Sequence, residues 1–243
     1  MGKNGLNIAI VGKDVSQPNA YFLVEKSLKL AAASSRIEIN IIYVDSHLVN
    51  KDNASDLLSN MNGILIPGGF TADGVEGMII AIEYARTNDV PFFGICLGMQ
   101  LTIIEFARNV AGLINATSSE FDSNSSSKLI DHLPSLKEGE LREGIFRCTL
   151  KEGSLIEHSY QASVVEETFR HGYNFNNAYR EILKDNGLII SATSNDDKYV
   201  EAVELNNHPF FLGVQFHPEQ TNVEEAHPLF LAFLEATFNN RKQ

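Results

Sequence analysis

The sequence is poor in the residues that mark several large classes of protein. It has no tryptophan, two cysteines, and 19 lysines and arginines against 31 acidic residues, for a formal net charge of −12. A chain this acidic lacks the basic face that nucleic acids and anionic membranes require. No apolar run is long enough to cross a bilayer, and residues 1–12 lack the layout of a signal peptide. A cytoplasmic protein with neither nucleic-acid nor membrane partners is therefore expected.

The two cysteines, Cys96 and Cys148, are too few for a disulfide framework. Free thiols in a reducing compartment are expected, and one of them is a candidate nucleophile. The phosphate-binding pattern G-x-x-x-x-G-K-[ST] is missing from the chain. No metal or organic cofactor is expected.

The first half of the chain shows a regular alternation of strand and helix signals. Buried strands are predicted at residues 6–11, 38–44, 64–66 and 91–95, and helices at residues 21–31, 75–85 and 97–111. Strands that alternate with helices predict an α/β fold with a mostly parallel sheet between two helical layers.

The pattern changes after residue 112. Residues 117–127 are rich in serine and asparagine and predict a loop. Short strands are predicted at residues 145–150, 188–192, 199–205 and 210–216, and a closing helix at residues 228–238. These strands either extend the main sheet or form an antiparallel layer beside it. With no internal repeat or linker, residues 1–243 are predicted to form a single domain.

The segment GICLGMQ at residues 94–100 has the form G-x-C-x-G between a strand and a helix. This pattern is typical of a nucleophile elbow with cysteine in place of serine. Glycines on both sides permit a tight, strained turn, and the helix N-terminus behind Cys96 favours the thiolate and offers N–H groups to an oxyanion. The alternative is a buried structural cysteine in a glycine-bounded turn.

The segment QFHPE at residues 215–219 supplies a base and an acid at the end of a predicted strand. His217 is expected within hydrogen-bond reach of the Cys96 sulfur, where it could accept the thiol proton, and Glu219 would fix its tautomer. PGGF at residues 67–70 follows another strand. The Gly69 and Leu97 N–H groups together would form an oxyanion hole, although an isolated PGG is better explained as an ordinary turn at the end of a strand.

The segments PGGF, GICLGMQ and FHPE, in this order and spacing, resemble the class I glutamine amidotransferases. Further segments resemble the glutaminase domain of CTP synthases: GVEG at 74–77, EYAR at 83–86, EFARNVAGL at 105–113, SEFD at 119–122 and HPLF at 227–230. The resemblance covers about residues 7–236. It implies a flavodoxin-like αβα sandwich with a small antiparallel addition.

The resemblance also implies a reaction. Cys96 would attack the side-chain amide of glutamine with His217 as base and then acid, ammonia would leave a γ-glutamyl thioester, and water would release glutamate. Glu120 would meet the α-amino group of the substrate, and the pocket would be lined by Gly68, Phe70 and Gln100.

Two departures leave alternatives open. The synthetase domain of CTP synthases is absent from this sequence, so the chain alone is not expected to make CTP, and a separate synthetase chain is a candidate partner. Gly172 stands where the family has an arginine that meets the glutamine carboxylate. Either Arg170 replaces it, or backbone N–H groups at Gly172 and Tyr173 hold the carboxylate, as in the similar H-G-F run of carbamoyl phosphate synthetase. A hydrolase of another γ-glutamyl amide and a non-catalytic regulatory homologue are the competing hypotheses.

Overall fold

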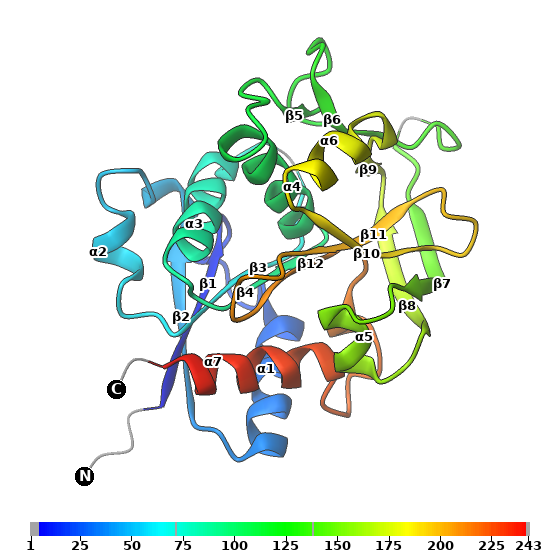
Figure 1. The fold of residues 1–243 in the computed structure, drawn as a ribbon. Coiled ribbons are helices and arrows are strands. Elements are labelled where there is room, and N and C mark those ends of the chain that lie inside the picture. Colours follow the sequence, from blue (N-terminus) through cyan, green and yellow to red (C-terminus); the bar gives the residue numbers. More distant parts are fainter. Residues whose placement is uncertain (1–4, 71, 138, 242–243) are drawn as a thin grey trace.

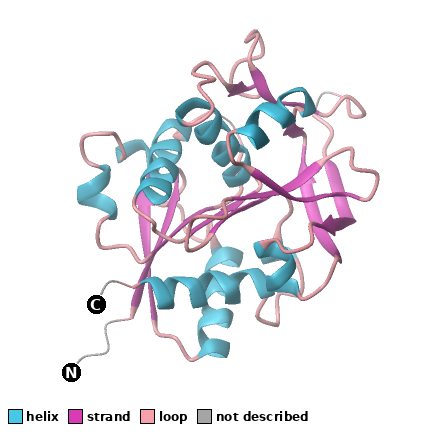
Figure 2. Ribbon diagram, viewed as in Figure 1, coloured by secondary structure: helices cyan, strands magenta, loops and turns pink. Residues whose placement is uncertain are grey.

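The computed structural model describes residues 5–70, 72–137 and 139–241. One large twisted sheet runs through this part of the chain with helices on both faces (Figures 1 and 2). Its nine strands have the order β2-β1-β3-β4-β12-β11-β10-β7-β8. Their bounds are β1 Leu6–Gly12, β2 Ile39–Asp45, β3 Gly63–Ile66, β4 Phe92–Ile95, β7 Arg142–Leu150, β8 Val164–His171, β10 Ile189–Ser194, β11 Val200–Glu204 and β12 Phe211–Val214.

Two helical layers cover the sheet. One layer contains α1 (Phe22–Ser35), α5 (Leu155–Tyr160) and α7 (Pro228–Asn240), and the other contains α2 (Ala54–Leu58), α3 (Val75–Thr87), α4 (Leu97–Asn109) and α6 (Arg180–Asp185) (Figure 1). Short 3₁₀ helices are η1 (Ser46–Leu48), η2 (Asn177–Tyr179) and η3 (Pro218–Gln220). Each layer closes over its own apolar cluster, because the central strands are apolar on both faces. The predicted α/β fold with two helical layers is confirmed.

The strands predicted in the second half extend the main sheet. β12 pairs in parallel with β4, and β11, β10, β7 and β8 then continue the sheet by antiparallel pairing. β8 was not predicted, since it is an edge strand whose polar residues alternate with half-buried ones. The antiparallel addition is therefore one wing of the same sheet.

A separate three-stranded sheet, also not predicted, has the order β5-β6-β9. Its strands are β5 Thr117–Ser118, β6 Lys128–His132 and β9 Tyr173–Phe175. The predicted loop at residues 117–127 is confirmed apart from the two residues of β5. Because β9 starts two residues after β8 ends, this small sheet lies beside the carboxyl edge of the main one.

Candidate active site

The backbone at Cys96 makes the sharp turn from β4 into α4 that the G-x-C-x-G pattern predicts. Cys96 has φ 52° and ψ −101°, a strained conformation that costs about 1–3 kcal/mol for a residue with a side chain. A Cβ added to Gly94 would lie 2.8 Å from the Gly98 carbonyl carbon, and one added to Gly98 would lie 2.4 Å from the Ile66 carbonyl oxygen. The turn therefore has no room for a side chain at either glycine.

Two neighbouring parallel strands bring Cys96 and His217 together. Cys96 directly follows β4, and His217 follows β12, its parallel neighbour. The carboxyl ends of parallel strands meet at one edge of the sheet, where α/β proteins place their sites. A Cβ added to Gly68 would lie 2.8 Å from His217 Cε1 and 3.5 Å from Cys96 Cβ, so Gly68 lies against both residues.

Glu219 orients the His217 ring. His217 Nδ1 donates to Glu219 Oε1 over 2.7 Å, which leaves Nε2 as the basic nitrogen. Nε2 is buried and forms no aligned hydrogen bond with any described residue, although Cys96 lies close enough to raise the pKa of His217, so the expected hydrogen bond to the sulfur stays a prediction. Burial alone would lower the pKa of His217, but the adjacent Cys96 and Glu219 outweigh it and raise the pKa to about 11. The site thus favours an imidazolium at His217.

The surroundings of the Cys96 sulfur include a residue that the sequence analysis did not single out. Gln215 Nε2 donates to Sγ over 3.6 Å, and the Arg170 carbonyl oxygen lies 4.0 Å from Sγ. Gln215 is fully buried, and its position two residues before His217 was the available signal. An N–H directed at sulfur stabilises the negative charge of a thiolate.

The residues predicted for the oxyanion hole are neighbours. A Cβ added to Gly69 would lie 3.2 Å from Leu97 Cδ2. Leu97 is the first residue of α4, where backbone N–H groups have no partner within the helix. The roles of Gly69 and Leu97 toward an oxyanion stay predictions.

A cavity of about 740 Å³ opens onto Cys96, and six of the predicted site residues line it. Its lining includes Gly68, Gly69, Phe70, Cys96, His217 and Glu219. The lining also includes Tyr21 and Phe22 at the start of α1, and Arg170. The sequence analysis predicted only that a helix begins near Tyr21 and Phe22, and no sequence signal placed these two residues in the cavity. The Arg170 guanidinium lies 5.8 Å from the centre of the half-exposed Phe70 ring.

The other predicted substrate residues lie toward the small sheet. Gln100 Nε2 donates to the Tyr173 carbonyl over 3.1 Å and to Gln215 Oε1 over 3.2 Å. The Gly172 carbonyl accepts from Leu133 N over 2.9 Å. Glu120 lies two residues after the end of β5, and its backbone N–H donates to Ser118 Oγ. Gln100 and Tyr173 are therefore joined to Cys96 through Gln215, and the role of Glu120 toward the substrate stays a prediction.

A buried charge cluster lies behind this segment. Arg142 Nη1 is 2.8 Å from Glu201 Oε1 and 3.3 Å from His171 Nε2. Burial raises the pKa of Glu201 to about 7 although Arg142 lowers it, and burial together with Arg142 lowers the pKa of His171 to about 3. The sequence analysis named none of these three residues as a site residue.

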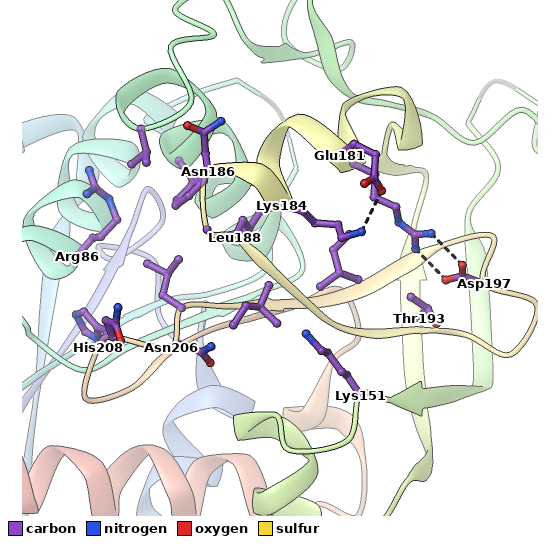
Figure 3. Close-up of a pocket in the computed structure, with 18 residues that line it drawn as sticks. Arg86, Lys151, Glu181, Lys184, Asn186, Leu188, Thr193, Asp197, Asn206 and His208 are labelled. Atoms are coloured by element: carbon purple, nitrogen blue, oxygen red, sulfur yellow. Dashed lines mark hydrogen bonds and ion pairs between the residues drawn. The ribbon is translucent and has the colours of Figure 1, made fainter.

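Another cavity, of about 930 Å³, lies elsewhere and is lined mainly by α6, by β10 and by residues 205–208, which follow β11 (Figure 3). Its charged side chains are largely paired: Arg180 contacts Asp197 at 2.9 Å, and Lys184 contacts Glu181 at 3.0 Å. None of the predicted site residues lines it. Its lining contains no cysteine and lacks the Cys96–His217–Glu219 arrangement, so it does not offer the chemistry found at Cys96.

Both cysteines are unpaired and buried. In the described residues no group of three or more histidine, cysteine, aspartate or glutamate side chains has the arrangement of a metal site. Over the same residues, no helix is both long and apolar enough to span a membrane.

The fold and the site are those of a class I glutamine amidotransferase. The model of that family matches residues 18–236, and the chain belongs to the family, whose members are cysteine-dependent glutamine amidohydrolases. The chain is 46% identical over 243 residues to the CTP synthase of Carboxydothermus hydrogenoformans, covering 98% of this chain and 45% of that protein. It is 48% identical over 236 residues to the CTP synthase of Geobacillus kaustophilus, covering 95% and 44%. The chain thus spans about half the length of the curated relatives it matches.

A solved structure agrees with this assignment. The glutaminase domain of Trypanosoma brucei CTP synthase with bound acivicin superposes with a TM-score of 0.90 at 34% identity, covering 98% of this chain and 96% of that one. A more distant structure, a glutamine amidotransferase from Thermotoga maritima, shares the fold with a TM-score of 0.57 at 13% identity, covering 97% of each chain. The predicted resemblance to the CTP synthase glutaminase domain is confirmed.

Proposed function

We propose that this chain hydrolyses the side-chain amide of glutamine at Cys96 and releases ammonia. The observation that carries the proposal is the arrangement of the strained, buried Cys96 beside a His217 ring that Glu219 orients. The Trypanosoma brucei relative, whose structure holds acivicin, supports a glutamine-like ligand for the same site.

The residues have distinct parts in the proposed reaction. The Cys96 thiolate attacks the amide carbon, and the Gly69 and Leu97 N–H groups receive the developing oxyanion. His217 gives its proton to the leaving nitrogen, so that ammonia departs and a γ-glutamyl thioester remains. His217 then takes a proton from water, the resulting hydroxide attacks the thioester, and glutamate leaves with regeneration of the cysteine thiolate.

The amino-acid end of glutamine is proposed to lie toward the small sheet. Glu120 would hold the α-amino group there, and Phe70 and Gln100 would shape the pocket. The carboxylate would meet backbone N–H groups at Gly172 and Tyr173, or Arg170. Arg170 lines the Cys96 cavity and its side chain is half exposed, 3.8 Å from Glu143, so it is available to a carboxylate.

Two further proposals concern what surrounds the reaction. The ammonia is proposed to pass to a synthetase unit on a separate chain or elsewhere in the same protein, because the relatives that share this domain are CTP synthases of about twice its length. We place the reaction in the cytoplasm, where the two unpaired cysteines would stay reduced.

A hydrolase of a larger γ-glutamyl amide is the second candidate. The cavity of about 740 Å³ extends from His217, which faces the leaving group, to the aromatic rings of Tyr21 and Phe22. A substituent on the amide nitrogen would find an apolar wall there.

An amide screen separates the candidates. Ammonia or amine release is measured from glutamine, asparagine and N-substituted γ-glutamyl amides, with the Cys96→Ala variant as the blank. Glutamine as the best substrate supports the glutaminase assignment, and a larger amide as the best substrate supports the second candidate. A protein without Cys96-dependent turnover of any of them, alone or with the synthetase part of a CTP synthase added, contradicts both and leaves the regulatory homologue.

A further inference from the structure

We propose that Arg142 is a positioning residue for the reaction: it fixes the His171 ring, and through it the buried amides that hold the Cys96 sulfur. This inference rests on the proposed function for its effect on turnover, but the geometry that carries it is independent of the substrate. Arg142 begins β7 and pairs across the ladder with His171, the last residue of β8. Neither touches the sulfur directly.

A continuous series of polar contacts runs from Arg142 to the nucleophile. Arg142 Nη1 donates to His171 Nε2 over 3.3 Å, and His171 Nδ1 lies 2.9 Å from the Tyr173 carbonyl oxygen. The same carbonyl accepts from Gln100 Nε2 over 3.1 Å. Gln100 Nε2 also donates to Gln215 Oε1 over 3.2 Å, and Gln215 Nε2 donates to Cys96 Sγ over 3.6 Å.

The direction of each hydrogen bond in this series follows from which atoms can only donate and which can only accept. A guanidinium can only donate, so His171 Nε2 must accept and Nδ1 must carry the proton. The Nδ1–H then donates to the Tyr173 carbonyl, which also fixes the backbone beside Gly172. The Gln215 side chain accepts from Gln100 at its oxygen, which turns its N–H toward the sulfur. If the His171 proton were on Nε2 instead, the Nδ1 lone pair would face the Tyr173 carbonyl oxygen, and this hydrogen bond would be lost.

Burial restricts the orientations of the side chains that make these contacts. Gln215 and Glu201 are fully buried, and His171 and Gln100 are 1% and 4% exposed. The Arg142 guanidinium lies 4.4 Å from the centre of the Phe169 ring and 4.5 Å from that of Phe146. Polar groups closed off from water have few alternative partners, so each of them holds the next in one orientation.

Glu201 supplies the charge that keeps Arg142 in place. Its Oε1 atom is 2.8 Å from Arg142 Nη1, and neither carboxylate oxygen has an aligned hydrogen bond within the described residues. The ion pair therefore holds Arg142 by charge and leaves the donor geometry to His171. Glu201 is connected to the nucleophile side as well, because its backbone carbonyl accepts from Gln215 N.

The test compares the rate of alkylation of Cys96 by iodoacetamide and the kinetics of glutamine hydrolysis in matched variants of the full chain. Arg142→Met removes the donor to His171. Arg147→Met is the control, since Arg147 lies on the same strand and pairs with Glu166 at the exposed surface. Arg142→Met is expected to slow Cys96 alkylation and to lower kcat, each about tenfold, as the loss of one aligned hydrogen bond implies. Arg147→Met is expected to change both by less than about twofold.

Three further variants distinguish positioning from folding. Arg142→Met combined with Glu201→Met removes both buried charges and should restore stability without restoring the alkylation rate. His171→Asn keeps an N–H near the Tyr173 carbonyl, whereas His171→Leu does not. Asparagine is expected to retain most of the alkylation rate and leucine to lose about tenfold.

Each possible result either supports or overturns the positioning role of Arg142. Equal alkylation rates in wild-type protein, Arg142→Met and His171→Leu overturn the proposal, as does recovery of the rate in the folded double variant. Slowed alkylation together with no hydrolysis of any γ-glutamyl amide by the wild-type protein would support the positioning role and contradict the proposed function.

Discussion

At the scale of single residues, the two cysteines have opposite surroundings. Cys96 faces the cavity beside His217, whereas Cys148 is fully buried in β7. Burial, together with the nearby Glu201 and Glu167, raises the pKa of Cys148 far above its usual range. A nucleophile must be a thiolate that the electrophile can reach, and Cys148 meets neither condition, whereas Cys96 lines the cavity.

Acivicin should therefore label Cys96 and spare Cys148. Peptide mapping by mass spectrometry after treatment with a slight excess of reagent measures this, and added glutamine should protect Cys96. Chloroacetamide, which lacks the amino-acid end, is the control for glutamine-like recognition. Labelling of Cys148 with Cys96 untouched would contradict the nucleophile assignment.

Gly172 is the position at which the proposed binding of the glutamine carboxylate can be tested. A Cβ at this position would lie 3.4 Å from the Glu140 carbonyl oxygen and from Leu141 Cδ2, which is ordinary contact. Gly172→Arg should fold, and it should lower the KM for glutamine about tenfold if a charge-assisted contact to the carboxylate is missing, since such a contact contributes about 1.5–3 kcal/mol. Steady-state kinetics measure this, and alkylation by iodoacetamide should be unchanged. An unchanged or higher KM would favour the backbone N–H groups of Gly172 and Tyr173 as the carboxylate site.

His171 should make the protein sensitive to acid. Its pKa is lowered to about 3 in the fold, chiefly by burial, whereas in an unfolded chain it is about 6.5. As the pH falls from about 6.5 toward 3, the unfolded state binds a proton that the folded state does not, so stability falls by up to about 1.4 kcal/mol per pH unit. His171→Asn removes this contribution.

Urea unfolding at several pH values between 6.5 and 3.5 measures the effect. The free energy of unfolding of His171→Asn should fall less steeply with acid than that of the wild-type protein. Parallel curves for the two proteins would show that His171 takes up its proton in the fold as easily as in the unfolded chain.

At the scale of elements, one buried carboxylate joins four segments around the loop that carries His217. Glu167 in β8 accepts hydrogen bonds from Tyr160 in α5 over 2.5 Å, from Thr221 just after η3 over 2.8 Å, and from His227 at the start of α7 over 3.0 Å. The next residue of β8, Thr168, accepts from His217 N over 2.7 Å. Both ends of the His-Pro-Glu turn are thereby attached to one strand.

Replacement of Glu167 by alanine should therefore destabilise the fold by about 3 kcal/mol, because it removes the acceptor of three hydrogen bonds, one of them from the buried His227. The neighbouring Glu166→Ala is the control. Glu166 is exposed and pairs with Arg147 at the surface, so its loss should cost less than about 0.5 kcal/mol. Equal shifts in the urea midpoint for the two variants would contradict the role assigned to Glu167.

The elements differ in how far the sequence predicts them. β1 and β4 are continuous apolar runs bounded by turn residues, and α4 shows helical periodicity directly after Cys96, so their positions follow from pattern alone. β8 was missed because it is a polar edge strand, and β9 because three residues are too few for a period. Cys96, His217 and Glu219 could be chosen from motif spacing. Gln215 and Arg142 could not be assigned their contacts, because these depend on how β7, β8 and β12 meet.

At the scale of the whole molecule, the sheet explains why residues from distant parts of the chain converge. Its parallel half supplies Cys96 at the end of β4, and its antiparallel wing supplies Arg142 and His171 at the start of β7 and the end of β8. β12 lies at the junction, parallel to β4 and antiparallel to β11. Gln215 and His217 follow it, so Cys96 and His217 meet where the two halves of the sheet join.

The most direct test of this account is the initial rate of ammonia release from glutamine by the purified protein, measured side by side with the Cys96→Ala variant. The substitution removes the sulfur and little volume, so the variant should keep the unfolding temperature of the wild-type protein within a few degrees. The account predicts measurable release of ammonia and glutamate in equal amounts by the wild-type protein and none above the blank by Cys96→Ala. Undiminished release by the folded variant would contradict it.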